Sequence, residues 1–199
     1  MTKTDNKAFS LIELLVSISI VTMITTIVMF GYTNFNDTLG VTSAAQEIAV
    51  AIRQAQTYGL DVRETKVGAG LFSFAYGIYF DPTNSPSDYY IFVDTNSNKK
   101  YDVGSGCGSG ATECIERMTL RNNVRVSSIC DSVSCPPSVT TKKLDVTFLR
   151  PNTDANVYFT DNTGVIVSGP VSLGRVKLIS PKGKIVTITV ESTGQISVQ

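Results

Sequence analysis

The chain has 199 residues, and its 17 Lys and Arg balance its 17 Asp and Glu, so the formal net charge is zero. A balanced charge gives no overall attraction to nucleic acid or to an anionic surface. The sequence has neither His nor Trp. Without His the commonest general base and metal ligand is missing, which argues against a hydrolase triad and a zinc enzyme. The length suits one domain with an appendage.

The first distinctive feature is an apolar run of 22 residues, from Phe9 to Phe30, with Glu13 as its one ionisable side chain. As a helix this run would be about 33 Å long, enough to cross a hydrocarbon core of about 30 Å. Lys3 and Lys7 precede it and favour a cytoplasmic N-terminus. A secretory signal predicts a shorter core followed by a small-residue cleavage site. A plain membrane anchor fits the length but leaves the cost of burying Glu13 unexplained.

The stretch AFSLIELL at residues 8–15, behind the basic leader MTKTDNKA, resembles the processing site of type IV pilins and type II secretion pseudopilins. The resemblance implies a leader at 1–8, cut by a prepilin peptidase between Ala8 and Phe9, with N-methylation of Phe9. The family usually has Gly where this chain has Ala8. Glu13 would then be the fifth mature residue and would pair with the N-terminal ammonium of a neighbouring subunit, because a buried charge is tolerable when paired.

Residues 31–59 are expected to continue the same helix with an amphipathic pattern. We expect one helix from about Ser10 to about Tyr58, with Gly59 as its stop and with Gly31 and Gly40 as weak points. Apolar residues recur at a spacing of three and four and predict one buried face. These residues are Val41, Ala45, Ile48, Ile52 and Ala55.

Residues 60–199 are predicted to form a β-rich globular head, because the apolar period changes to two and Gly, Pro and Asn punctuate the runs. Turns are expected at SPKGK (180–184) and STGQ (192–195). The fold class is therefore α+β: a pilin-like long N-terminal helix, its first half (9–30) transmembrane, packed on an antiparallel β-sheet. The predicted strands are Phe72–Phe80, Tyr89–Val93, Ile115–Leu120, Val124–Ile129, Leu144–Leu149, Val157–Thr160, Arg175–Ile179, Ile185–Val190 and Gln195–Val198.

The segments GKIVTITVESTGQISV and LDVTFLRPNTDANVYFTDNTG resemble the GspH/FimT subfamily of minor pilins and pseudopilins. The absence of Pro near Phe30, where many major pilins have one, favours a minor component. The resemblance implies a structural filament subunit, not an enzyme, with a single pass through the bacterial inner membrane and the head outside the cytoplasm. Its partners would be other pilins or pseudopilins of a type IV pilus or type II secretion filament, besides the prepilin peptidase.

The stretch FVDTNSNKKYD at 92–102 offers alternate oxygen-bearing side chains, as calcium loops do. Lys99 stands where such a loop has Gly, and Ser105 where it has Glu, although Glu113 or Glu116 could fold back. The alternative is a turn in which the Asn and Asp side chains cap the backbone. The candidate ligands for Ca²⁺ are Asp94, Asn96, Asn98, the carbonyl of Lys100, and Asp102.

All four cysteines, Cys107, Cys114, Cys130 and Cys135, lie in the predicted head. An even number in an exported domain favours disulfides. Local pairing, Cys107 with Cys114 and Cys130 with Cys135, is preferred, while crossed pairings stay open. The sequence lacks the C-x-x-C spacing and the His of zinc and redox sites.

An alternative function is DNA capture at a pilus tip, as some FimT-like proteins are reported to perform with basic residues near the C-terminus. Phosphate contacts require clustered cations, and the final stretch STGQISVQ carries none. The Gly-rich GSGCGSG at 104–110 lacks the Lys that completes a phosphate loop. The cations that would have to form a DNA-binding patch are Lys142, Lys143, Arg175, Lys177, Lys182 and Lys184.

Overall fold

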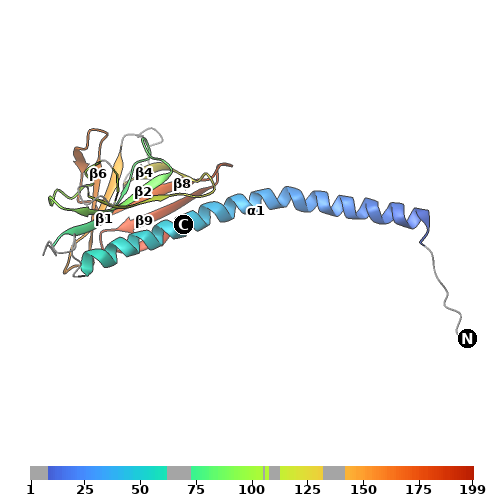
Figure 1. The fold of residues 1–199 in the computed structure, drawn as a ribbon, viewed down its shortest axis with the longest axis horizontal. Coiled ribbons are helices and arrows are strands. Elements are labelled where there is room, and N and C mark those ends of the chain that lie inside the picture. Colours follow the sequence, from blue (N-terminus) through green and yellow to red (C-terminus); the bar gives the residue numbers. More distant parts are fainter. Residues whose placement is uncertain (1–8, 62–72, 105, 108–112, 132–141) are drawn as a thin grey trace, which may run out of the picture. The chain divides into compact units, whose positions relative to one another are not determined.

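The computed structural model describes residues 9–61, 73–104, 106–107, 113–131 and 142–199 (Figure 1). The chain divides into two units, Met1–Asn36 and Asp37–Gln199. A single helix, α1 (Leu11–Leu60), belongs to both units and passes through Gly31 and Gly40 without a break. Its 50 residues correspond to a length of about 75 Å. The prediction of one long helix is confirmed.

Within the described residues, ten strands follow the helix, and all nine predicted strands are present with shifted ends. The first one, predicted from Phe72, begins at Ala75. The sequence did not predict β7, which has only three residues. In chain order the strands are β1 (Ala75–Phe80), β2 (Asp88–Asp94), β3 (Cys114–Thr119), β4 (Arg125–Cys130), β5 (Lys143–Phe148), β6 (Ala155–Thr160), β7 (Ile166–Ser168), β8 (Leu173–Ile179), β9 (Ile185–Glu191) and β10 (Ile196–Val198).

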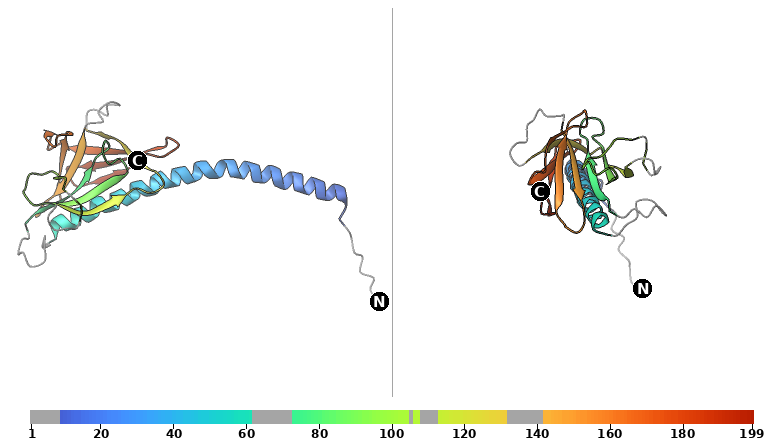
Figure 2. Two further views of the ribbon diagram at one scale, coloured as in Figure 1. Left: turned by 45° about the horizontal axis from the view of Figure 1, so that its top comes forward. Right: turned by 90° about the vertical axis from the view of Figure 1, so that its left-hand side faces the viewer.

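The strands form two antiparallel sheets, whereas the sequence predicted one. A six-stranded sheet has the order β3-β2-β1-β5-β6-β7, and a four-stranded sheet has the order β10-β9-β8-β4. Figure 2 shows the head from two further directions. The sheets approach each other closely at Gly174 of β8, where an added Cβ would lie 3.0 Å from Leu144 of β5 and from Val157 of β6. The α+β class is confirmed, with the head built as two layers of sheet.

The turns between β8, β9 and β10 lie where the sequence placed them. The amide of Ser180 donates to the carbonyl of Lys184, and the amide of Glu191 donates to that of Gln195. Gly183 and Gly194 have φ of 84° and 83°, a left-handed backbone that Gly adopts without a steric penalty. The two hairpins therefore follow from local turn chemistry.

One hydrophobic core joins the second half of α1 to both sheets, and the helix lies beside the strands there (Figure 1). All five residues of the predicted stripe, Val41, Ala45, Ile48, Ile52 and Ala55, are 0% exposed. They share the core with inward side chains of the six-stranded sheet and of the four-stranded sheet. Burying each large apolar side chain contributes about 1.5–3 kcal/mol, so this face holds the helix in the head.

Gly59 is not the helix stop that the sequence predicted, because α1 continues to Leu60. Gly59 is buried, and a Cβ there would lie 2.4 Å from the carbonyl oxygen of Phe148 in β5. The amide of Arg150 also donates to the Gly59 carbonyl at 3.1 Å. The glycine therefore permits the end of the helix to approach the end of β5.

We expect Gly59→Ala to lower the free energy of unfolding of the head by about 1–3 kcal/mol, because the new methyl group overlaps backbone that cannot rotate away. Urea unfolding of the full chain in detergent, followed by circular dichroism, measures the change. Gly31→Ala is the matched control, since nothing lies within 4 Å of its added Cβ. Equal effects of the two substitutions would contradict the close approach.

Candidate functional site

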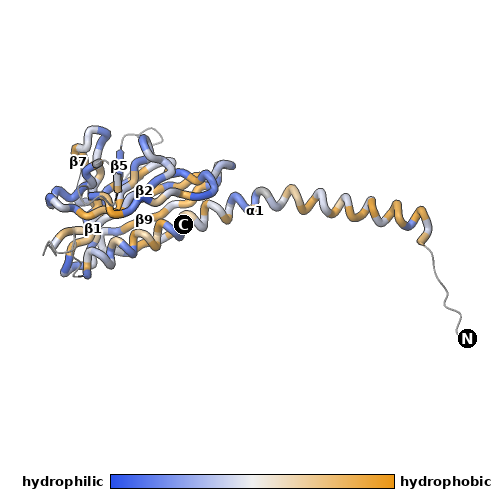
Figure 3. Tube along the Cα trace, in the orientation of Figure 1, coloured by the Kyte–Doolittle hydropathy of each residue, from blue (hydrophilic) through white to orange (hydrophobic). Residues whose placement is uncertain are grey.

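The unit Met1–Asn36 presents an apolar helical surface, drawn in Figure 3 as a mostly hydrophobic stretch of α1. Its large apolar side chains are exposed, from Phe9 at 75% to Phe30 at 77%. By length and composition, α1 is long and apolar enough to cross a membrane. Ala8 and the rest of the predicted leader lie outside the described residues. The predicted cleavage there therefore stays a prediction.

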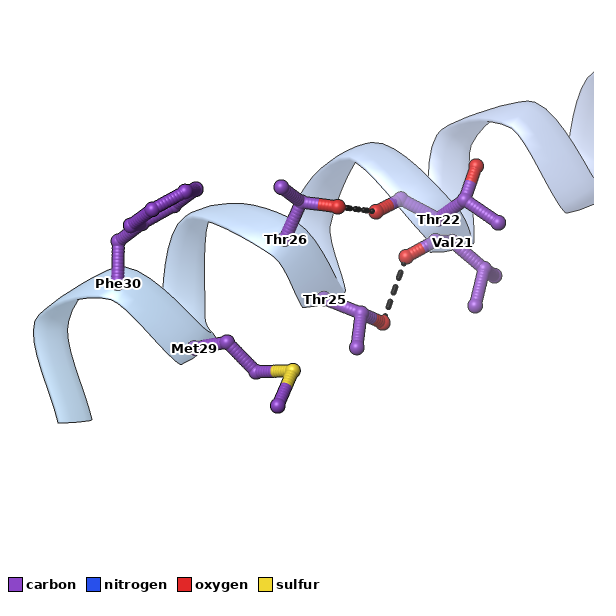
Figure 4. Close-up of a pocket in the computed structure, with 6 residues that line it drawn as sticks. All are labelled: Val21, Thr22, Thr25, Thr26, Met29 and Phe30. Carbon is purple, nitrogen blue, oxygen red and sulfur yellow. Dashed lines mark hydrogen bonds between the residues drawn. The ribbon is translucent and has the colours of Figure 1, made fainter. Parts of the chain in front are cut away.

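Hydroxyl groups in this apolar stretch are satisfied by the helix itself. Figure 4 shows two of these hydrogen bonds: the hydroxyl of Thr25 donates to the carbonyl of Val21, and the hydroxyl of Thr26 donates to the carbonyl of Thr22. Such bonds remove a donor that would otherwise need water, as a surface facing hydrocarbon requires. Three further hydroxyl groups donate to backbone carbonyls at 2.7–2.9 Å: Ser17 to Glu13, Ser19 to Leu15 and Thr22 to Ser19.

The carboxylate of Glu13 differs from these hydroxyls, because an ionised carboxylate only accepts hydrogen bonds and cannot donate to a helix carbonyl. Glu13 lies in the first turn of α1, where the helix dipole favours a negative charge. It is exposed, and within the described part of the chain none of the ion pairs involves it. Among the described residues, Glu13 therefore has no ion-pair partner.

The N-terminal segment also matches a known family. Residues 3–29 match the family model of the prokaryotic N-terminal methylation motif. The motif indicates a type IV pilin-like filament subunit. It implies processing by a prepilin peptidase and assembly into filaments, and with the apolar helix it suggests membrane anchoring. Proteins with this motif form a structural family rather than an enzyme family. No curated protein and no solved structure matches the chain.

In the pilin-like head, the predicted calcium residues come together in the loop after β2. Asp94 is 2% exposed, and its two oxygens accept the backbone amides of Asn98 and Lys99 at 3.0 and 2.8 Å. Lys99 has a φ of 67°. It therefore adopts a left-handed backbone at the position where a calcium loop usually has Gly. The side-chain amides of Asn96 and Asn98 both donate to Asp102, at 2.6 and 2.7 Å.

Glu113, just before β3, folds back onto this loop, as the sequence had left open. One oxygen accepts the amide and hydroxyl of Thr95, at 3.0 and 3.1 Å, and the other accepts the amide of Asp102 at 2.9 Å. Burial raises the pKa of Glu113, against these hydrogen bonds, which lower it. Glu113 therefore holds the two ends of the loop together.

These contacts favour the hydrogen-bonded turn over a calcium site. The side-chain NH2 groups of Asn96 and Asn98, rather than their side-chain oxygens, face Asp102. The Lys100 ammonium lies 3.4 Å from the same carboxylate. Burial raises the pKa of Asp102, but hydrogen bonds from Asn96 and Asn98 outweigh it and lower that pKa. Within the described ranges, no three Asp, Glu, His or Cys side chains are grouped to hold a metal. Calcium binding stays a prediction of the sequence.

We expect Asp94→Ala to destabilise the head by about 1–3 kcal/mol, because two backbone amides lose their acceptor. Thermal unfolding with EDTA and with added calcium measures the loss, which should be equal in both. Asp154→Ala, at an exposed position, is the control and should change little. A destabilisation seen only with calcium would show that the loop binds the ion.

A disulfide joins Cys107 to Cys114, with their Cα atoms 4.7 Å apart. It ties the segment after the loop to the first residue of β3, and it is one of the two local pairings preferred from the sequence. Cys135 lies outside the described residues, so its pairing with Cys130 stays a prediction. The disulfide fixes the loop over the outer face of the six-stranded sheet.

Asp145 is the residue at this face that sequence reasoning missed. It lies on β5 and is 0% exposed, and its oxygens accept the amide of Tyr101 at 2.8 Å and the hydroxyl of Thr160 at 2.9 Å. Burial raises the pKa of Asp145 to about 7, while the hydrogen bonds from Tyr101 and Thr160 act in the opposite direction. Asp145 lies between the apolar Leu144 and Val146 in β5, and Tyr101, from the loop after β2, covers it.

Asp145 should make the stability of the head depend on pH. Because its folded pKa of about 7 exceeds its ordinary 3.8, the folded state binds this proton more tightly than the unfolded chain. The stabilisation is complete below pH 3.8 and is lost as pH rises through about 7. We therefore expect the difference in unfolding free energy between wild type and Asp145→Asn to fall across this window, as measured by urea unfolding.

Asp161→Asn provides the control for this pH series. The Thr163 hydroxyl and nearby amides lower the pKa of Asp161, so its contribution changes only below its ordinary 3.8. The difference between wild type and Asp161→Asn should stay flat from pH 4 to 8. A flat profile for Asp145→Asn as well would contradict the assignment of a titrating Asp145.

The cations considered for DNA capture lie in different surroundings. Lys143 is 7% exposed and pairs with Asp81 at 3.1 Å. The prediction that it could belong to an exposed DNA-binding patch is therefore wrong. Lys142 pairs with Asp131 at 3.6 Å. The remaining cations lie on β8 or in the turn after it: Arg175, Lys177, Lys182 and Lys184.

Proposed function

We propose that this chain is a minor pilin or pseudopilin of the GspH/FimT kind, built into a type IV pilus or a type II secretion filament through α1. The observation that carries the proposal is the Glu13 carboxylate, the one charge in the run from Phe9 to Phe30, which forms no ion pair with any of the described residues. The methylation motif over residues 3–29 supports the same reading.

Processing would create the partner that Glu13 lacks. Cleavage between Ala8 and Phe9 releases a new N-terminal amine four residues before Glu13, and methylation of Phe9 keeps that amine basic. The amine of one subunit then meets the Glu13 carboxylate of the next. Two opposite charges in apolar surroundings attract strongly, and each would be costly without the other. The pair therefore selects one axial register between subunits.

Assembly draws its free energy from the apolar surface that the helix exposes. Side chains from Leu11 to Phe30 are mostly more than half exposed, and in a filament they would pack against the same segments of neighbouring subunits. Before assembly this surface would lie in the inner membrane, which the helix crosses once, with the head outside the cytoplasm. The hydroxyl groups satisfied within the helix suit both environments.

DNA capture receives less support from the residues. Binding to phosphates needs several cations free to approach one strand. Lys143 is buried against Asp81, and Lys142 is paired with Asp131. The structural role requires no such patch, so we extend the proposal no further in this direction.

Replacing Glu13 by Gln tests the proposed assembly mechanism in cells that express the complete filament machinery. Leaving the buried ammonium without its partner costs about 3–5 kcal/mol, so incorporation into sheared filaments should fall by more than roughly tenfold. Membrane fractionation should show unchanged insertion, and mass spectrometry should still find the mature N-terminus at Phe9. Quantitative blotting of the filament fraction gives the readout.

Glu47→Gln is the matched control, since it removes a carboxylate from the same helix within the head unit. It should leave incorporation close to wild type. Wild-type incorporation of Glu13→Gln would disprove the charge pairing. A filament-borne chain that retains residues 1–8 would disprove the processing step.

A further inference from the structure

A hollow of about 440 Å³ lies on the head, beside the aromatic side chains of the outer face of the six-stranded sheet. Rings of Tyr79 in β1, Tyr90 in β2 and Tyr101 in the following loop line it. The volume falls within the range of small-molecule sites, about 300–1,000 Å³. All of these residues belong to the unit Asp37–Gln199.

The three tyrosines form one compact aromatic wall. Tyr90 and Tyr101 are stacked, with ring centroids 5.5 Å apart and planes inclined by 19°. Tyr79 lies 4.9 Å from Tyr101 and 5.9 Å from Tyr90. The faces of such rings carry partial negative charge and attract weakly positive C–H bonds. Tyr79 and Tyr101 are buried, at 3% and 7% exposure, whereas Tyr90 is half-buried. Tyr90 therefore presents the accessible ring, and the other two rings hold it in place.

The charged groups around the hollow are already paired. Lys143 lies 3.1 Å from Asp81, and Arg117 donates to Asp88 at 2.6 Å. Asp81 also accepts the side-chain amide of Asn84 at 2.9 Å. A ligand with a net charge would have to compete with these ion pairs. The charge balance therefore favours a neutral ligand.

The lining also offers neutral groups that both donate and accept hydrogen bonds. The hydroxyls of Ser85 and Tyr90 lie 3.3 Å apart and share one hydrogen bond, so each keeps further capacity for another. A molecule that carries several hydroxyl groups matches this mixed capacity. A purely apolar ligand would leave these hydroxyls without partners, at a cost in binding free energy.

We propose that this hollow, lined by Tyr79, Tyr90 and Tyr101 with Ser85 and Asn84, binds a neutral saccharide. The C–H face of a sugar ring packs on the accessible ring of Tyr90, which Tyr79 and Tyr101 hold from behind, and its hydroxyl groups exchange hydrogen bonds with the lining. This site is independent of the assembly role of α1. It would give the head a means to contact a neutral glycan.

The test is saturation-transfer NMR on the full chain in a zwitterionic detergent that contains no sugar headgroup, because a glycoside detergent would compete. The probes are the methyl glycosides of glucose, galactose, mannose and N-acetylglucosamine, with an immobilised array of neutral oligosaccharides. Inorganic phosphate and N-acetylneuraminic acid serve as anionic probes. We expect transfer to at least one neutral glycoside, together with retention on the corresponding array spots.

Tyr90→Leu keeps an apolar side chain but removes the ring and its hydroxyl, and should weaken Kd by roughly tenfold. Tyr58→Leu, a half-buried tyrosine of α1 outside the hollow, should bind as wild type does. Ser85→Ala is the second variant in case Tyr90→Leu unfolds, and should weaken Kd severalfold. Circular dichroism checks the fold of each variant.

Three results would overturn the proposal: no transfer to any neutral glycoside, binding that Tyr90→Leu and Ser85→Ala both leave unchanged, or binding of the anionic probes alone. None of these results bears on filament assembly, which the Glu13 experiment tests separately.

Discussion

The structure of the head depends on the burial of one face of α1. Val41, Ile48 and Ile52 are fully buried among side chains that come from both sheets. Because the six-stranded and four-stranded sheets share this cluster, the helix and the two sheets have one common core. The sequence shows the same change: apolar residues surround the helix up to Phe30, whereas beyond Gly40 most of them lie on one buried face, with Val50 as an exposed exception. One uninterrupted helix thus serves two environments, and the pattern of its side chains changes where the environment does.

Charges in apolar surroundings follow different rules in the two units. In the head, Lys143 and Asp81 lie 3.1 Å apart, and Asp145 is held by a backbone amide and a hydroxyl. Each buried charge there finds its partner in the same chain, as a domain that folds by itself requires. Glu13 forms no ion pair with any of the described residues. Among the described residues, the buried charges of the head are therefore paired, whereas Glu13 is not.

The sequence predicted most of the fold because periodicity reports which faces are buried. The helix stripe and all nine predicted strands rest on repeats of 3.6 and 2, which burial imposes. β7 was missed because three residues, Ile166–Ser168, are too few to establish a period. Gly59 was misread as a stop, since its role depends on the carbonyl of Phe148, which is far away in the sequence. Local patterns cannot report such tertiary contacts.

Only some residues of the candidate site could be predicted from the sequence. Glu13 was identified because a charge within an apolar run is a local anomaly. Asp145 was not, since acidic residues on alternate strand positions are usually exposed, and here Tyr101 arrives from a loop to cover it. Likewise Glu113 was one of two candidates to fold back, and only the positions of Thr95 and Asp102 decide between them. Residues whose role depends on partners far away in the sequence produce no local pattern from which that role could be predicted.

The loop between β2 and β3 gives the six-stranded sheet a second use. The inner face of that sheet is committed to α1, so any recognition must use its outer face or its edges. Glu113 and the Cys107–Cys114 disulfide hold the loop over the outer face, where Tyr101 joins Tyr79 and Phe92 in a second, smaller cluster. Gly77 makes room for this arrangement, because a Cβ there would lie 2.8 Å from the Phe92 ring. The two faces of the sheet therefore carry different contacts: the inner face holds the helix, and the outer face carries the tyrosine cluster that borders the hollow.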